Sequence, residues 1–146
     1  MRYFEDVATG DKIETAGYGP LTIVDTVRWA GVQENLERLH WDREFAREHS
    51  NLPTFIASGS YRQALLARTL TDWVGPRGRL RKLSLRHTAP TLEGDMIYYS
   101  AVVSGKSSTA SDSWISCDIE GHNQENKPIL TGRCVLALPL RTRAGR

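Results

Sequence analysis

The hydrophobic pattern changes its period once along the chain, and this change constrains the fold more than any other feature. Over residues 56–76 the apolar side chains cover more than half of a helix circumference, and the stretch ends at Gly75-Pro76, a strong helix stop. Over residues 80–139 apolar and polar residues alternate, which is the period of a strand. One long helix followed by strands predicts an α+β domain, with an antiparallel β-sheet wrapped around one long central helix.

The central helix is predicted to begin with a capping box formed by Ser60 and Gln63. Its apolar residues predict a helix that is buried on most sides, with small alanines that let a sheet approach closely. These residues are Tyr61, Ala64, Leu65, Leu66, Ala67, Leu70, Trp73 and Val74.

The strands are predicted as an antiparallel meander, because turn-forming segments at 90–95, 105–112 and 121–128 separate four alternating stretches. The stretches contain Leu83 and Leu85, residues 97–103, residues 115–119 and residues 129–138.

Two shorter helices are predicted before the central one, after an opening of loops and short extended pieces. The first covers residues 24–32, where Val24, Val27, Ala30 and Gly31 recur at helical spacing. The second begins at Asp42, a residue type that caps helices, and is expected to turn Phe45 and Ala46 inward.

The composition is that of one folded domain, predicted over residues 1–140 with a basic, frayed tail at 141–146. Nineteen Lys and Arg against 17 Asp and Glu leave a net charge of +2, which offers no electrostatic case for a nucleic-acid partner. We expect neither a signal peptide nor a membrane span, because no apolar run is long enough, and therefore a cytoplasmic protein. No metal site is expected, since neither the two cysteines nor His49, His87 and His122 have ligand spacing.

Four segments of the chain, taken in order, resemble a known family. They are residues 3–11; residues 25–31 with 39–42 and Ala46; residues 86–90 with Gly94-Asp95; and residues 123–124 with 130–132 and 136–139. Together they resemble the MaoC-like hydratase/dehydratase family, the (R)-specific enoyl-CoA hydratases and their relatives, which have the hotdog fold.

The resemblance implies reversible addition of water to a 2-enoyl thioester, giving a 3-hydroxyacyl thioester. The expected substrate is an acyl-CoA, so no separate cofactor is needed. A base takes a proton from water, an acid delivers one to the α-carbon, and hydrogen-bond donors stabilise the enolate-like thioester oxygen. Family members use an Asp, a His five residues later, and a backbone N–H near the start of the central helix.

Carried over residue by residue, the resemblance assigns catalytic roles to His40, Asn35 and Gly59. His40 stands at the family histidine, but Asn35 stands where the aspartate is expected, and the usual His-Gly pair reads Ser58-Gly59. The candidate substrate-binding residues are Ser58, Ser60, Asp42, Arg79 and Arg81, the last two facing the phosphates of coenzyme A.

The exchange of Asp for Asn35 leaves three hypotheses, because an amide cannot act as a base near neutral pH. His40 carries out both proton steps while Asn35 positions the water, or Glu34 or Glu37 has become the base. Alternatively, the chain is a non-catalytic or weakly active subunit that completes the acyl-CoA pocket of a partner. A thioesterase on the same fold is the weaker alternative. The resemblance also implies a homodimer, or a heterodimer with a related chain, paired edge to edge.

Overall fold

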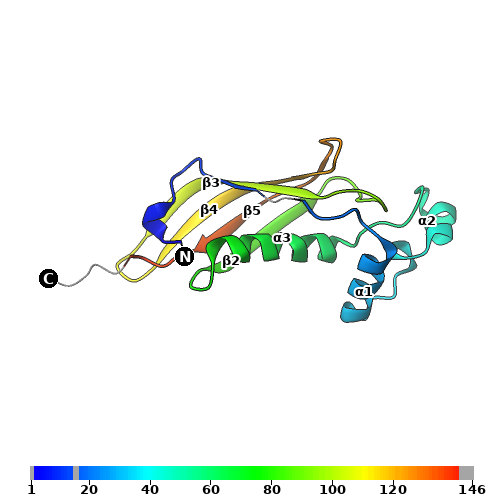
Figure 1. The fold of residues 1–146 in the computed structure, drawn as a ribbon, viewed down its shortest axis with the longest axis horizontal. Helices are drawn as coiled ribbons and strands as arrows, with labels where there is room; N and C mark the ends of the chain where they lie inside the picture. The colour runs from blue at the N-terminus through cyan, green and yellow to red at the C-terminus, as the bar shows by residue number, and fades with distance from the viewer. Residues whose placement is uncertain (1, 15–16, 142–146) are drawn as a thin grey trace.

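The computed structural model describes residues 2–14 and 17–141, which form one antiparallel sheet and three α-helices (Figure 1). The sheet has five strands in the order β1-β3-β4-β5-β2. The elements, in chain order, are β1 (Lys12–Glu14), α1 (Ile23–Gln33), α2 (Arg43–Ser50), α3 (Gly59–Val74), β2 (Arg79–His87), β3 (Tyr98–Ser108), β4 (Ser113–His122) and β5 (Pro128–Ala137). Short 3₁₀ helices occupy Phe4–Asp6 and Arg38–His40. The predicted α+β class is confirmed.

The strand order departs from the predicted meander at one position. Strands β3, β4 and β5 do follow one another across the sheet, but β2 pairs with β5 instead of β3. Crossing the sheet from β2 to β3 spans three inter-strand spacings, roughly 14 Å, which residues 88–97 are long enough to cover. The crossing segment is held in place by hydrogen bonds, including Ala57 N–H to the Thr91 carbonyl at 2.9 Å and Leu21 N–H to the Asp95 carbonyl at 2.9 Å.

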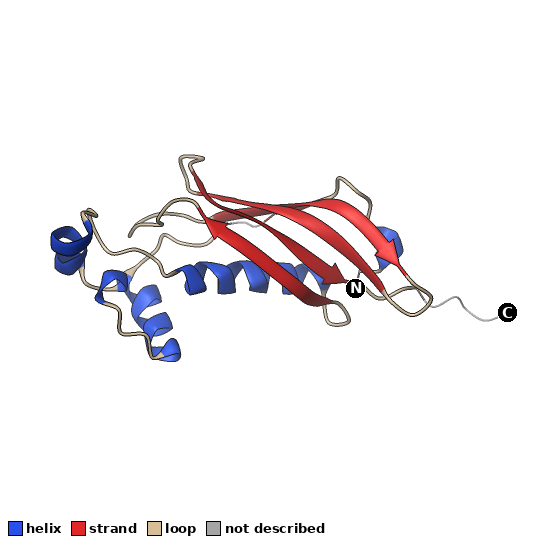
Figure 2. Cartoon of the chain, turned by 180° about the vertical axis from the view of Figure 1, so that it is seen from behind, coloured by secondary structure: helices blue, strands red, loops and turns tan. Residues whose placement is uncertain are grey.

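Helix α3 lies along one face of the sheet, as Figure 2 shows, and is buried along a single row. The buried residues recur every fourth position, namely Arg62, Leu66, Leu70 and Val74. The predicted burial on most sides is wrong for this chain, because the sheet covers only one side. Tyr61, Ala64, Leu65, Ala67 and Trp73 are only partly covered.

The start of α3 also differs from the prediction. Ser58, not Ser60, is the N-cap, and its hydroxyl accepts from the backbone N–H of Tyr61 at 3.2 Å. The Ser60–Gln63 capping box is therefore wrong. A serine two residues earlier has the extended backbone that a cap requires, and the Ser60 side chain is engaged elsewhere.

Helices α1 and α2 lie beyond the N-terminal end of α3 (Figure 1). Asp42 caps α2 as predicted, and Ala46 is fully buried. In α1 the covered residues are Thr26 and Ala30, whereas Val24 and Val27 are about half exposed, at 50% and 49%. Helical spacing thus located the helix but not the face that packs.

No helix in the described part of the chain is long and apolar enough to cross a membrane.

Of the predicted tail, Arg141 contacts the N-terminal segment through Glu5 and Asp6, and residues 142–146 lie outside the described residues.

Candidate functional site

Two hydrogen bonds between residues 39–40 and Ile56 hold His40 close to the segment that precedes α3. Its Nδ1 lies 3.0 Å from the carbonyl oxygen of Ile56, and the Ile56 N–H donates to the Leu39 carbonyl at 3.2 Å. A carbonyl oxygen can only accept, so neutral His40 carries its proton on Nδ1. Its Nε2 then has a free lone pair, which is the state of a general base.

Asn35 and Ser58 line the same small cavity as His40, together with residues of α1 and α3. The cavity measures about 10 Å³, and its remaining lining residues are Thr26, Trp29, Ala30, Gln33 and Tyr61. This volume is about that of one water molecule and is too small for an acyl group. The structure therefore brings three of the predicted site residues together around a water-sized space.

The Asn35 side chain is oriented by its own loop. Its Oδ1 accepts from the backbone N–H of Glu37 at 3.2 Å, which leaves the amide NH₂ as the group free to act as donor. Glu34 and Glu37 are exposed, and neither lines the cavity. Of Asn35, Glu34 and Glu37, the residues predicted to replace the catalytic aspartate, Asn35 is thus the one that lines the cavity with His40.

Ser60 connects α1 to α3. Its hydroxyl accepts from the indole Nε1–H of Trp29 at 3.0 Å and donates to the side-chain oxygen of Gln33 at 2.6 Å. The hydroxyl of Ser58 lies 3.1 Å away from that of Ser60. Trp29 also packs against Tyr61, with the ring centroids 5.8 Å apart. These contacts set the position of α1, and with it one wall of the cavity.

Gly59 is the first residue of α3, so its backbone N–H has no partner within the helix. The imidazole of His87, at the end of β2, packs against it: a Cβ at residue 59 would lie 3.1 Å from Nε2 of His87. Burial, followed by the charge of Arg62, lowers the pKa of His87 below its ordinary value. His87 is therefore neutral at physiological pH and adds no charge to the helix N-terminus.

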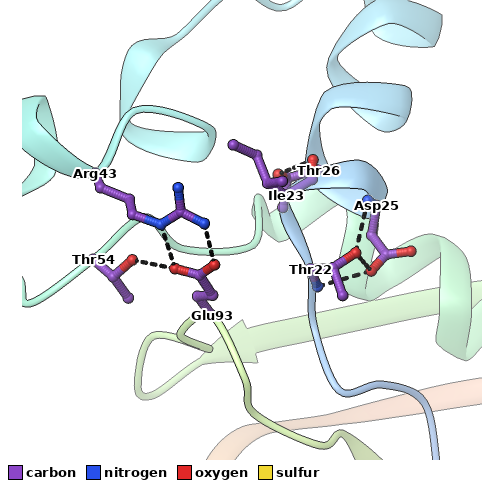
Figure 3. A network of polar contacts seen from close by, with 7 residues as sticks. All are labelled: Thr22, Ile23, Asp25, Thr26, Arg43, Thr54 and Glu93. Carbon is purple, nitrogen blue, oxygen red and sulfur yellow. Dashed lines mark hydrogen bonds and ion pairs between the residues drawn. The ribbon is translucent and has the colours of Figure 1, made fainter.

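The Asp42 carboxylate stabilises the local structure around the start of α2. Its carboxylate accepts from the Phe45 N–H at 3.0 Å and pairs with Arg38 at 2.7 Å, and these contacts lower the pKa of Asp42. In the same region Arg43 and Thr54 both bind the carboxylate of Glu93, as Figure 3 shows, which ties α2 to the segment before β3.

Arg79 and Arg81 lie at the start of β2, whereas His87, beside Gly59, lies at its end. The strand separates the two ends by roughly 26 Å. Arg81 pairs with Asp112, and its guanidinium lies over the ring of Trp114. Within one chain, the structure does not bring these arginines to the cavity.

Several residues at the site are not predicted by the sequence alone. Trp29, Gln33 and Tyr61 line the cavity, and His87 and Arg62 surround the start of α3. Their sequence signal was only that of packing residues or of a lone histidine, because their partners are distant in the chain. Among the described residues, no group of three or more His, Cys, Asp or Glu could hold a metal ion.

Comparison with known proteins identifies the family of the chain. The profile of the MaoC-like domain matches residues 5–115, and the chain belongs to this family. Membership supports hydratase or dehydratase chemistry as the class of activity. No curated protein matches the sequence.

Solved structures establish the hotdog fold. A monoamine oxidase regulatory protein from Archaeoglobus fulgidus superposes with a TM-score of 0.83 at 24% identity, covering 97% of this chain and 96% of that one. The (R)-hydratase PhaJ1 from Pseudomonas aeruginosa gives 0.83 at 19% identity, covering 99% and 92%. The ChsH1–ChsH2 complex from Mycobacterium tuberculosis contains a chain that gives 0.78 at 20% identity, covering 90% and 98%.

Proposed function

We propose that the protein is a hydratase/dehydratase that acts reversibly on a 2-enoyl/3-hydroxyacyl thioester, with an acyl-CoA as the substrate. One observation carries this proposal: the Nδ1 contact of His40 with Ile56 leaves Nε2 as the nitrogen that can accept a proton, and His40 and Asn35 line one water-sized cavity before α3. This arrangement supplies a base, a place for a water molecule and, at Gly59, a helix N-terminus for a developing anion.

In the hydration direction, Asn35 donates a hydrogen bond to the attacking water, and His40 Nε2 takes a proton from it. The water oxygen forms its bond to the β-carbon, and the π electrons of the enoyl group move onto the thioester oxygen as an enolate. The N–H of Gly59 and the dipole of α3 stabilise that oxygen. The proton on His40 then passes to the α-carbon, which completes the 3-hydroxyacyl thioester. Dehydration follows the same steps in reverse.

We also propose that the active protein is a homodimer, or a heterodimer with a related chain. Strand β2 is an edge of the sheet in the described chain, and such edges favour pairing with another strand. The cavity of about 10 Å³ has no room for an acyl group, so the acyl group must lie outside it, against a surface that a second subunit would cover. A stable monomer in light scattering would contradict this part of the proposal.

A second candidate function is a non-catalytic subunit that completes a partner's acyl-CoA pocket. The presence of an amide at position 35 favours it, because no Asp or Glu of the described residues lines the cavity with His40. The two candidates differ in what the purified chain does alone.

The test is hydration of crotonyl-CoA, of a longer and of a branched enoyl-CoA, followed by loss of the conjugated thioester absorbance. We expect turnover by the wild type and a loss of about 10²-fold or more in His40→Ala. His49→Ala removes an exposed histidine of α2 and is the matched control, with activity unchanged. Turnover that survives in His40→Ala would overturn the site assignment. A folded dimer without turnover on any substrate would favour the non-catalytic subunit.

A further inference from the structure

Arg62 is a buried cation of the central helix. Its side chain is on the buried row of α3 and is only 5% exposed. One terminal nitrogen donates to the carbonyl of Ala89 at 2.8 Å and to the hydroxyl of Thr91 at 3.3 Å, while Nε is buried without a partner. In residues 2–14 and 17–141 no carboxylate forms an ion pair with it. Burying an arginine in this way is costly, and apolar residues would fill the position more stably.

The charge lies close to the start of α3. Residues 59 and 62 are three positions apart, so they are neighbours on one face of the helix. Helical side chains point back toward the N-terminus, which directs Arg62 toward the turn that begins with Gly59. The contacts of Arg62 agree with this direction. Its partner Thr91 also accepts a hydrogen bond, through its carbonyl, from the N–H of Ala57, two residues before that turn.

The other polar groups around Arg62 do not cancel its charge. His87, which packs against Gly59, has a lowered pKa and is neutral. The hydroxyl of Tyr99 donates to the backbone carbonyl of Arg62 at 2.7 Å, and burial raises the pKa of Tyr99, so it is neutral as well. The guanidinium field therefore acts in a region of low dielectric at the helix N-terminus, where it adds to the field of the helix dipole.

We propose that Arg62 is a positioning residue for the thioester site, where its buried charge reinforces the first N–H groups of α3 in stabilising negative charge on the thioester oxygen at Gly59. This inference rests on the proposed function. A purely structural Arg62 would instead serve only to bind the Ala89 carbonyl and the Thr91 hydroxyl of the crossing segment. The two roles differ in whether the charge matters or only the hydrogen bonds.

The test uses acetoacetyl-CoA, a thioester that ionises to a coloured enolate without being turned over. Wild-type protein is expected to bind it with a lowered ligand pKa, measured from the enolate absorbance against pH. Arg62→Gln keeps hydrogen-bond donors but removes the charge, and we expect the enolate fraction at fixed pH to fall about tenfold or more. Arg62→Lys keeps the charge and is expected to retain most of the enolate. Arg133→Gln, the same exchange at an exposed arginine of β5, is the control and should match the wild type.

With the ligand bound, three outcomes would overturn the inference while leaving the proposed function standing. The enolate fraction in Arg62→Gln could equal that of the wild type, which would show that the charge is not felt by the ligand. Arg62→Lys and Arg62→Gln could lose the enolate equally, which would assign Arg62 a structural role. Wild type could bind acetoacetyl-CoA without any lowering of its pKa. If the ligand fails to bind at all, measured by tryptophan fluorescence, the proposed function fails together with the inference. Circular dichroism verifies folding, and Arg62→Met replaces the Gln variant if that variant does not fold.

Discussion

The imidazole of His87 packs against Gly59 so closely that a Cβ at residue 59 would lie 3.1 Å from its Nε2 atom. This contact joins the end of the edge strand β2 to the first turn of the central helix. Gly59 has no side chain, so none of its own atoms covers its backbone N–H at the start of α3. Glycine is needed at position 59 because His87 packs closely against it, not because the backbone is left-handed.

The first prediction concerns this contact. Gly59→Ala should push the ring of His87 away and narrow the approach to the helix N-terminus, while lowering the free energy of unfolding by about 1–3 kcal/mol. We expect kcat/KM for crotonyl-CoA to fall at least about tenfold. Gly31→Ala is the control, because no atom lies within 4 Å of its added Cβ. The double variant Gly59→Ala/His87→Ala should recover part of the lost activity, and strictly additive losses would show that the two residues are not coupled.

The second prediction concerns Asn35. Asn35→Asp preserves the acceptor for the Glu37 N–H and adds a carboxylate beside His40, which should raise kcat about tenfold or more. Asn35→Ala should lower kcat, because the water loses its donor. Stopped assays on enoyl-CoA substrates measure both. A fall in activity for Asn35→Asp would contradict the idea that Asn35 occupies the position of the family's catalytic aspartate.

The third prediction concerns the connection between α1 and α3. Ser60→Ala removes the shared partner of Trp29 and Gln33, which should lower the free energy of unfolding by about 1–2 kcal/mol. Since these contacts position a wall of the cavity, activity should fall too. Thermal unfolding and turnover are the measurements, with Gln63→Ala, an exposed change on the same helix, as the control. An unchanged melting temperature would mean that α1 is held by other contacts.

The fourth prediction concerns acid stability. Hydrogen bonds and the charge of Arg43 lower the pKa of Glu93, so the folded state holds its carboxylate ionised to lower pH than the unfolded state does. The stabilisation is present above the ordinary glutamate pKa of about 4.3 and is lost as pH falls through the lowered value. Arg43→Met should therefore lower the melting temperature at pH 7 and reduce its further loss between neutral and acidic pH.

The control for this prediction is Glu48→Gln, which alters an exposed carboxylate of α2. Its melting temperature should follow pH as that of the wild type does. If Arg43→Met shows the same dependence on pH as the wild type, the pair with Glu93 does not contribute to the linkage.

Part of the candidate site could be predicted from the sequence because its signals are local. His40 and Asn35 stand in one short loop, and the cap at Asp42 follows from its position before α2. The cap of α3 lies two residues before the predicted Ser60, since Ser58 and Ser60 are the same residue type and differ only in backbone conformation and partners. Arg62 appears in the sequence as one polar residue of a helix, and only its surroundings make it a buried charge.

By itself, the sequence determined which segments are helices and which are strands, because the period of the apolar residues is a property of neighbouring positions. It also determined that α3 lies against an antiparallel sheet. Only the tertiary structure decided that β2 pairs with β5, that α1 turns Thr26 and Ala30 inward instead of Val24 and Val27, and that His87 meets Gly59. A stripe of apolar residues predicts that a surface will be covered, but it does not predict which element will cover it. The covering partner depends on how distant segments cross, and that is settled by packing of the whole chain.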